Sequence, residues 1–327
     1  MANITVLGCG FGTALSVQFD RQGHKVTAYT KFQSEVDDIL RDGEHKRLLP
    51  GVPVPSSISF TTDISKVRDA DFVVVAIPTK FLRTTIAEIP PFVTANTIIV
   101  DVGKGLEDDT LKRRTEVIAE YLPDNPLVYL TGPCHAEEVG RGMPTAIVAA
   151  STDKAAALTV QAAIGSESLR VYASSDIIGC EFGAALKNPI ALCVGILEGM
   201  GCGDNTRAAL MTRGLAEITR LACAVGANPQ TLLGLSGVGD LIVTCMSAHS
   251  RNHRAGLLIG GGMNAAEAVA KVGTVEGYEC ARPALRLAQK HGVETPIIAE
   301  LCDICFGEKK PFDSLAELMQ RESKSKE

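Results

Sequence analysis

A lysine and an asparagine interrupt an otherwise apolar stretch in the second half of the chain. Lys187 and Asn188 lie within residues 182–192, whose other side chains are all apolar. Burying an ammonium group is costly, and a lysine in such a place lowers its pKa unless an opposite charge holds it. A desolvated lysine can act as a general acid or base. Lys187 is therefore the first candidate for chemistry. The alternative is a lysine that reaches the surface or forms a structural ion pair.

Two further polar groups occur beyond this segment. Asp240 stands between a glycine pair and an apolar run, where an unpaired carboxylate would be costly, so we expect it to pair with Lys187. Ser250, Arg251 and Asn252 precede a helical pattern at 255–259. A hydroxyl, a guanidinium and backbone N–H groups at a helix start can bind a phosphate. The alternative is a turn that only caps the helix.

Two loops in the first half also carry polar groups after predicted strands. Lys104 lies between Gly103 and Gly105 at the carboxyl end of one strand, where open α/β sheets bind their ligands. The loop at 131–136 follows another strand and contains His135. His135 could be catalytic, but a lone loop histidine more often makes a local hydrogen bond.

A cluster of glycines separates the first predicted strand from the first predicted helix. Gly8, Gly10 and Gly12 lie in the sequence Gly-Cys-Gly-Phe-Gly-Thr-Ala, which ends at Ala14. Glycines there let the backbone turn tightly and approach a pyrophosphate, and the helix start offers unpaired N–H groups. The spacing is G-x-G-x-x-x-A and not the standard G-x-G-x-x-G. Its position still predicts a dinucleotide site, with a plain strand-to-helix turn as the alternative.

The residue after the second predicted strand bears on cofactor choice. Sites selective for NAD usually place an acid there to hold the ribose hydroxyls. This chain has Lys31 instead, which can meet a 2′-phosphate. Lys31 therefore favours NADPH, and the alternative is a solvated lysine at a strand end.

Alternating strand and helix patterns position these residues. The predicted strands are residues 4–7, 25–29, 57–61, 72–77, 97–102, 127–130, 145–149 and 169–172. Several are apolar on both faces, as parallel strands covered by helices are. Beyond Asp176 only helical patterns occur. The prediction is an α/β fold, with an N-terminal Rossmann-type, mainly parallel sheet domain at 1–175 that binds NAD(P). An all-helical substrate and catalytic domain follows at 176–327.

Composition narrows the class of protein. The 327 residues are 46% hydrophobic and 21% charged, which is typical of globular domains, and the net charge of −6 argues against general nucleic-acid binding. Most of the ten cysteines lie in apolar segments, so we expect a reducing cytoplasm. The single C-x-x-C, at Cys302 and Cys305, has no second pair, so no metal site is predicted. The apolar stretch at 182–200 contains charges and is predicted to be a buried core helix, with no membrane span.

Together these segments resemble the soluble, bacterial-type NAD(P)-dependent glycerol-3-phosphate dehydrogenases. The resemblance runs from about residue 4 to about residue 312, and its most specific parts are 185–188, 239–241, 250–252 and 275–277. It implies reversible reduction of dihydroxyacetone phosphate to sn-glycerol 3-phosphate with NADPH or NADH. The product would supply glycerophospholipid synthesis. The partner is a small phosphorylated substrate, and a homodimer stays open.

The resemblance also implies roles for individual residues. The catalytic group comprises Lys187, Asp240 and Lys104. The substrate contacts would be made by Lys104, Gly132, Cys134, Lys187, Asp240, Ser250, Arg251 and Asn252. The cofactor contacts would be made by Gly8, Gly10, Phe11, Gly12, Lys31, Lys104, Ala136, Arg251, Thr274 and Glu276.

This chain departs from the family pattern at three places. The glycine loop is one residue shorter, with Phe11 where the family has tryptophan. Cys134 and His135 replace the usual serine and phenylalanine, and Pro189 replaces an aliphatic residue. The first departure bears on cofactor affinity and the second on a substrate contact.

Two other functions stay as alternatives. One is another dehydrogenase with a Rossmann and a helical domain, such as a 3-hydroxyisobutyrate-type enzyme, against which the phosphate-binding pattern at 250–252 argues. The other is a nucleotide-binding relative without catalysis, which the shortened glycine loop favours.

Overall fold

A computed structural model describes residues 1–320 of the chain. The chain forms two compact units, the first of residues Met1–Glu107 and Lys112–Glu181, the second of Asp108–Leu111 and Phe182–Glu327. The sequence placed the domain boundary after residue 175. The compact units divide between Glu181 and Phe182, within the helix α7 (Ile177–Gly199). Residues 321–327, the end of the predicted helical domain, lie outside the described part.

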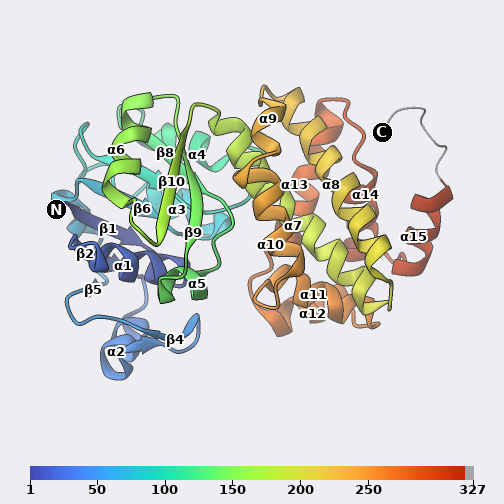
Figure 1. Cartoon of the computed structure of the whole chain (residues 1–327), viewed down its shortest axis with the longest axis horizontal. Coiled ribbons are helices and arrows are strands. Elements are labelled where there is room, and N and C mark those ends of the chain that lie inside the picture. The colour runs from blue at the N-terminus through green and yellow to red at the C-terminus, as the bar shows by residue number, and fades with distance from the viewer. Residues whose placement is uncertain (321–327) are drawn as a thin grey trace. The chain divides into compact units, whose positions relative to one another are not determined.

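The first unit is built on an eight-stranded sheet (Figure 1), in the order β10-β9-β8-β7-β6-β1-β2-β5. Its strands are β1 (Asn3–Leu7), β2 (Lys25–Tyr29), β5 (Ser59–Thr61), β6 (Phe72–Val75), β7 (Ile98–Asp101), β8 (Leu127–Thr131), β9 (Thr145–Ala150) and β10 (Leu169–Ser174). All neighbours are parallel except β8 and β9, which are antiparallel. The predicted mainly parallel sheet is therefore confirmed.

Helices cover both faces of this sheet. One core cluster joins the strands to α1 (Phe11–Arg21), α5 (Ala136–Arg141) and α6 (Lys154–Ile164). The other joins them to η1 (Ile64–Asp69), α3 (Thr79–Ile86) and α4 (Arg114–Tyr121). In β6, Val74 belongs to the first cluster, and Val73 and Val75 belong to the second. Apolar residues on both faces of one strand are what a doubly covered sheet requires.

The helix α4 begins only at Arg114, although the pattern of the sequence is helical from residue 110. The preceding residues instead form a turn, in which Leu111 has a φ of +60° and Leu106 pairs with Arg113 as an isolated bridge. A residue with a positive φ, such as Leu111, cannot be part of a right-handed helix. The helix therefore begins at Arg114.

A small lobe that the sequence did not predict follows β2. It comprises α2 (Gln33–Asp42) and the antiparallel hairpin of β3 (Glu44–His45) and β4 (Leu49–Pro53) (Figure 1). Leu49 and Val52 are fully buried and belong to the core cluster of α1 and α5. The lobe is therefore anchored to the sheet domain by β4.

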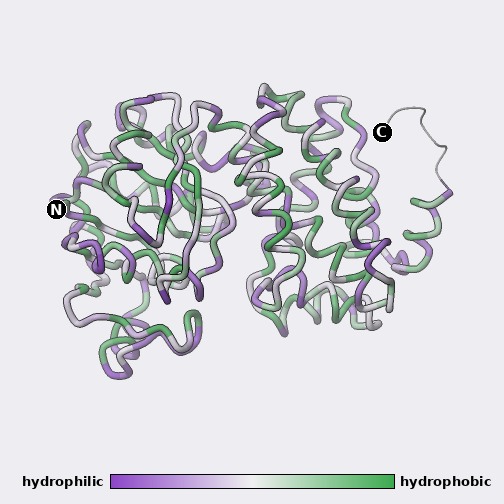
Figure 2. Tube along the Cα trace, in the orientation of Figure 1, coloured by the Kyte–Doolittle hydropathy of each residue, from purple (hydrophilic) through white to green (hydrophobic). Residues whose placement is uncertain are grey.

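From Ile177 onward the described residues form only helices, as predicted. The second unit contains α7 from Phe182 onward, α8 (Asp204–Ala224), α9 (Pro229–Leu232), η2 (Leu235–Gly239, a π-helical turn), α10 (Asp240–Met246), α11 (Arg251–Gly260), α12 (Ala265–Val272), α13 (Glu276–Lys290), α14 (Pro296–Phe306) and α15 (Pro311–Gln320). Figure 2 shows hydrophobic and hydrophilic residues alternating along these helices. Such amphipathic helices bury one face against each other.

The longest helix, α7, is the core of this arrangement. It is the one described helix that is by itself long and apolar enough to cross a membrane, and 94% of its most apolar window is buried inside the protein. The bent pair formed by residues 229–246 and α11 meets the same test of composition only when taken together. The burial of α7 agrees with the predicted core helix.

Candidate functional site

Glycines on α7 bring neighbouring backbones into direct contact with it. A Cβ atom at Gly183 would lie 2.3 Å from the carbonyl oxygen of Ser236 in η2, and one at Gly195 would lie 2.2 Å from that of His253 in α11. These distances are far below van der Waals contact, so only glycine permits the packing. The backbone of α7 thereby fixes the turn that precedes α10 and the first part of α11.

The glycines that follow behave differently from one another. A Cβ atom at Gly199 would lie 2.4 Å from the carbonyl oxygen of Leu257, whereas one at Gly201 or Gly203 would meet nothing within 4 Å. Neighbouring backbones therefore pack closely at Gly195 and Gly199 and not at Gly201 or Gly203. Gly201 instead has a φ of +81°, where the chain leaves α7.

Lys187 and Asp240 form a buried pair, as the sequence predicted. The Lys187 Nζ donates hydrogen bonds to Asp240 Oδ1 and, at 2.6 Å, to Thr244 Oγ1. Only 4% of Lys187 and 1% of Asp240 is exposed. An ion pair at this depth requires good geometry and further hydrogen bonds to offset its desolvation. Because burying this ion pair costs desolvation free energy, its presence marks the pair as a candidate functional site.

Thr244 completes this arrangement, and sequence reasoning missed it. Its hydroxyl donates to the carbonyl oxygen of Asp240 at 2.7 Å and accepts from Lys187 Nζ. The two residues are four apart on α10, so their side chains share one face of the helix. That spacing was the available signal, but it gains meaning only once Asp240 is known to begin the helix.

Buried amides link α7 to α11 and α13. Asn188 Nδ2 donates to Glu276 Oε2 at 3.0 Å, and Asn252 Nδ2 donates to Asn188 Oδ1 at 2.9 Å. The backbone N–H of Gly277 then donates to Asn252 Oδ1 at 2.8 Å. Both ends of the Asn252 amide are therefore used between helices. This chain of bonds fixes the N-termini of α11 and α13 relative to Lys187.

The segment at 250–252 has both features that the sequence left open. Ser250 caps α11, because its Oγ accepts from the His253 backbone N–H at 3.2 Å. Arg251 is the first residue of the helix and is exposed. Within residues 1–320, its guanidinium has no hydrogen bond or ion pair to another side chain. The cap therefore orients a helix start whose cation is available to an anion.

In the first unit, the Lys104 loop rests on a buried ion pair. Arg114 donates to both carboxylate oxygens of Asp101, at 2.9 Å and 2.6 Å, and these residues are 1% and 0% exposed. Arg114 also donates to Thr79 Oγ1 at 3.1 Å, and Thr79 Oγ1 in turn donates to the Lys104 carbonyl oxygen at 3.2 Å. Arg114 thus fixes the loop backbone at the Lys104 carbonyl oxygen through the Thr79 hydroxyl.

Gly103 explains how this loop can pass so close to the guanidinium. A Cβ atom at Gly103 would lie 2.2 Å from Arg114 Cζ. The Tyr129 hydroxyl donates to the Gly103 carbonyl oxygen at 2.8 Å. Sequence reasoning missed Asp101, Arg114 and Tyr129, since nothing in their spacing shows that they meet.

The glycine loop fits a dinucleotide in three separate ways. Gly8 and Gly10 have φ values of +102° and +84°, which favour glycine. A Cβ atom at Gly8 would lie 2.6 Å from the Ala76 carbonyl oxygen, and one at Gly12 would lie 3.1 Å from Ala76 Cβ. The start of α1 has no side-chain cap and no acid in its first turn. Its N–H groups and dipole can therefore receive a pyrophosphate despite the shortened loop.

Lys31 is not a simple solvated lysine. Its Nζ lies 2.7 Å from Glu88 Oε1, and the two side chains are 44% and 45% exposed. The hydrogen bond to Glu88 raises the pKa of Lys31, so the side chain stays charged. A 2′-phosphate at this place would compete with Glu88 for the ammonium group.

The loop after β8 places its predicted contacts near the start of α5. Gly132 has a φ of +146°, and the Cys134 thiol donates to its carbonyl oxygen at 3.0 Å. His135 precedes α5, and Ala136 is its first residue. Thr274, predicted to contact the cofactor, is half-buried just before α13.

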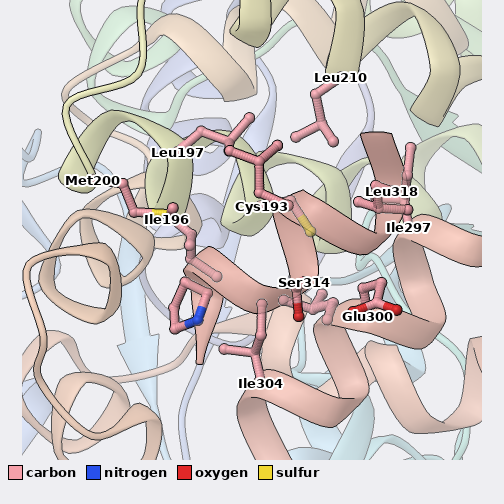
Figure 3. Close-up of a pocket in the computed structure, with 13 residues that line it drawn as sticks. Cys193, Ile196, Leu197, Met200, Leu210, Ile297, Glu300, Ile304, Ser314 and Leu318 are labelled. Atoms are coloured by element: carbon pink, nitrogen blue, oxygen red, sulfur yellow. The ribbon is translucent and has the colours of Figure 1, made fainter. Parts of the chain in front are cut away.

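A small apolar cavity lies elsewhere, among α7, α8, α14 and α15 (Figure 3). Its volume is about 40 Å³, and its labelled lining includes Cys193, Ile196 and Ile304. Burial raises the pKa of Cys193 well above its usual value. None of the predicted site residues lines this cavity, so it is separate from the candidate site.

A sheet domain with a glycine loop, followed by helices that bury a lysine–aspartate pair, defines a nicotinamide-dependent dehydrogenase of two parts. Residues 3–157 match the family described as NAD-dependent glycerol-3-phosphate dehydrogenase N-terminus, and residues 176–316 match the corresponding C-terminus. The chain belongs to this family and is an oxidoreductase that uses NADH or NADPH. The resemblance stated from the sequence is confirmed.

Individual relatives agree over nearly the whole chain. The chain is 46% identical to the glycerol-3-phosphate dehydrogenase [NAD(P)+] of Thermoanaerobacter sp. (strain X514), covering 98% of each chain. It is 45% identical to the enzyme of that name from Agathobacter rectalis, covering 99% of this chain and 97% of the relative. The crystal structure of glycerol-3-phosphate dehydrogenase from Coxiella burnetii superimposes with a TM-score of 0.94 at 33% identity, over 98% of this chain and 99% of that one.

Proposed function

We propose that this protein reduces dihydroxyacetone phosphate to sn-glycerol 3-phosphate with NADPH or NADH, reversibly, and so supplies glycerophospholipid synthesis. The observation that carries the proposal is the buried Lys187–Asp240 pair on a glycine-packed helix, in a chain of this family. We assign cofactor binding to residues 1–175 and substrate binding and catalysis to residues 176–327.

The chemistry needs a proton donor and positive charge near the ketone oxygen. A bound nicotinamide supplies the two-electron reduction of the carbonyl carbon. Lys187 Nζ then gives a proton to the developing alkoxide. Asp240 and Thr244 hold that nitrogen in place, and Lys104 adds positive charge on its braced loop. Asn188, with both amide ends bonded, keeps the supporting helices in register.

An assay tests this function directly. We expect purified protein to oxidise NADPH or NADH when dihydroxyacetone phosphate is added, with one cofactor consumed per glycerol 3-phosphate formed. Ketones that carry a carboxylate in place of the phosphate serve as the comparison. Turnover of the carboxylated ketones alone would contradict the proposal, and so would the absence of turnover with both classes.

Arg251 is proposed as the phosphate anchor. Arg251→Ala should raise the KM for dihydroxyacetone phosphate about ten- to a hundredfold, because a charge-assisted contact to phosphate contributes roughly 1.5–3 kcal/mol. The matched control is Arg254→Ala, an exposed arginine one turn further along α11. Cofactor affinity is measured separately by fluorescence titration, since Arg251 is also assigned to the cofactor. Equal KM values for the two variants would remove Arg251 from the anchor.

Lys31 is proposed to bind the 2′-phosphate, so NADPH should be used at least as well as NADH. Lys31→Asp should lower the ratio of kcat/KM for NADPH to that for NADH by about tenfold or more, through lost attraction and added repulsion. Glu88→Gln should change this ratio in the opposite direction, because it releases Lys31 from its present partner. A ratio that neither substitution changes would show that Lys31 does not contact the cofactor.

We also propose that the enzyme works in the cytoplasm. All ten cysteines are free thiols in the structure, and six of them are buried. Such use of cysteine as a small apolar residue is typical of reducing compartments.

A further inference from the structure

Three metal-ligating side chains of the first unit meet beside the glycine loop. They are Cys9 from the loop itself, Glu35 from α2 and His45 from β3. One sulfur, one carboxylate oxygen and one ring nitrogen all lie within 4.8 Å of one another. Among the described residues, no other group of three or more such side chains comes together in this way.

His45 gives an independent indication that something is to be bound here. The side chain is 5% exposed, and its Nε2 is buried without a hydrogen-bond partner. Glu35 Oε1 is 3.9 Å from that nitrogen, too far for a hydrogen bond. Buried polar atoms in folded proteins nearly always have a hydrogen-bond partner or a ligand. His45 Nε2 has neither, and it lies near a carboxylate and a thiol, so a bound ligand would supply the missing partner.

The ring can present this nitrogen to a cation. A histidine ligand binds a cation through the lone pair of one nitrogen of the neutral ring, while the other ring nitrogen carries the proton. The Leu48 N–H is already bonded to the His45 carbonyl oxygen at 3.2 Å and makes only a longer contact of 3.4 Å to Nδ1. Because Nδ1 accepts this contact, the proton of the neutral ring lies on Nε2 in this structure, and it must move to Nδ1, with loss of the longer Leu48 contact, for Nε2 to act as a ligand.

Glu35 is held so that one carboxylate oxygen can be released. The Thr30 hydroxyl donates to Oε2 at 2.6 Å and fixes the orientation of the group. Arg47 donates to Oε1 at 2.5 Å, but its side chain is 69% exposed and can move into solvent when a cation takes its place. A hollow of about 230 Å³, lined by Glu35, His45 and Arg47 among others, gives access from outside.

We propose that Cys9, Glu35 and His45 form a binding site for a borderline-soft divalent cation, Zn²⁺ in the first instance. Thiolate, imidazole and carboxylate are the ligands that Zn²⁺ takes in proteins, and three of them leave one tetrahedral position open to water. Donors around tetrahedral zinc lie about 3.5 Å apart, so side-chain shifts on the order of 1 Å would close the site.

The proposal accounts for a cysteine that the reaction does not use. Cys9 carries its thiol in the glycine loop, within 4.8 Å of the other two ligand atoms. A cation would displace the proton and bind the sulfur. Because Gly8 and Gly10 flank Cys9, occupation of the site would tie the glycine loop to the lobe of α2, β3 and β4.

The test is a metal titration of the full chain, stripped with a chelator beforehand. We expect one Zn²⁺ per chain by calorimetry, and with Co²⁺ a thiolate-to-metal charge-transfer absorption. Cys9→Ala, Glu35→Gln and His45→Gln should each weaken binding by about a hundredfold, and Cys9→Ala should abolish the absorption. The matched control, Cys223→Ala, removes an exposed thiol elsewhere and should leave both unchanged.

Three results would overturn the proposal. They are an affinity that Cys9→Ala leaves unchanged, an absorption that Cys223→Ala removes, and a chain that binds no metal. Melting curves of the metal-free variants show whether each one folds. If Cys9→Ala does not fold, His45→Gln decides the question by the same titration.

Discussion

Lys187→Met should lower the turnover of each folded molecule by about a hundred- to ten-thousandfold, with cofactor binding retained. Methionine has a similar length and suits the apolar surface of α7, so the helix can still form. The substitution removes the proposed proton donor, whose contribution as a general acid would be of that size, and the positive charge proposed to stabilise the alkoxide. Turnover is measured with saturating dihydroxyacetone phosphate and cofactor, and cofactor affinity by fluorescence titration.

The same substitution has a second consequence that a pure surface lysine would not show. It leaves the Asp240 carboxylate, 1% exposed, without its ammonium partner. Removing one member of a buried pair costs about 3–5 kcal/mol of folding free energy. We therefore expect Lys187→Met to melt at a lower temperature, and the double variant Lys187→Met/Asp240→Asn to recover much of the loss because no charge stays buried.

The double variant separates catalysis from folding. If Lys187 is the proton donor, the double variant regains stability and stays inactive. If the lysine serves only the fold, its folded molecules turn over normally, and that outcome contradicts the mechanism. Lys271→Met, at an exposed position on α12, is the matched control and should change neither quantity.

Much of this site could be predicted from the sequence, because the desolvation cost of a buried charge is visible from the apolar residues that flank it in the chain. A charge inside an apolar helix needs a partner wherever the helix lies, and Asp240 was the carboxylate in an equally costly setting. The strands were also readable, since β6 is apolar on both of its faces. The glycine loop could be recognised because its position, after the first strand and before the first helix, is typical of dinucleotide-binding domains.

What the sequence did not reveal depends on contacts between distant segments. The antiparallel pairing of β9 with β8 depends on how the chain crosses the sheet and not on the composition of either strand. The Lys31 ammonium looked free because Glu88 is 57 residues away. Cys9, Glu35 and His45 are separated in the same way, so the prediction of no metal site considered only the C-x-x-C of Cys302 and Cys305.

Arg114→Met, which removes the guanidinium next to the Lys104 loop, should strongly destabilise the first unit. It leaves Asp101, which is fully buried, without its cation, and the expected loss is about 3–5 kcal/mol of unfolding free energy. Arg286→Met is the matched control. Its single ion pair to Asp108 joins side chains that are 50% and 67% exposed, so little change is expected there. Urea unfolding of the two variants measures the difference.

The activity of a double variant that replaces both Arg114 and Asp101 then tests whether this ion pair positions Lys104. In Arg114→Met/Asp101→Leu no charge is buried, so most of the stability should return. Thr79 has still lost the Arg114 donor, and the guanidinium no longer lies beneath Gly103. Lys104 should therefore be held less firmly, and kcat/KM for dihydroxyacetone phosphate should fall by about tenfold or more while the KM for cofactor changes less. A stable double variant with unchanged kcat/KM would mean that the ion pair serves only the fold and does not support the role proposed for Lys104.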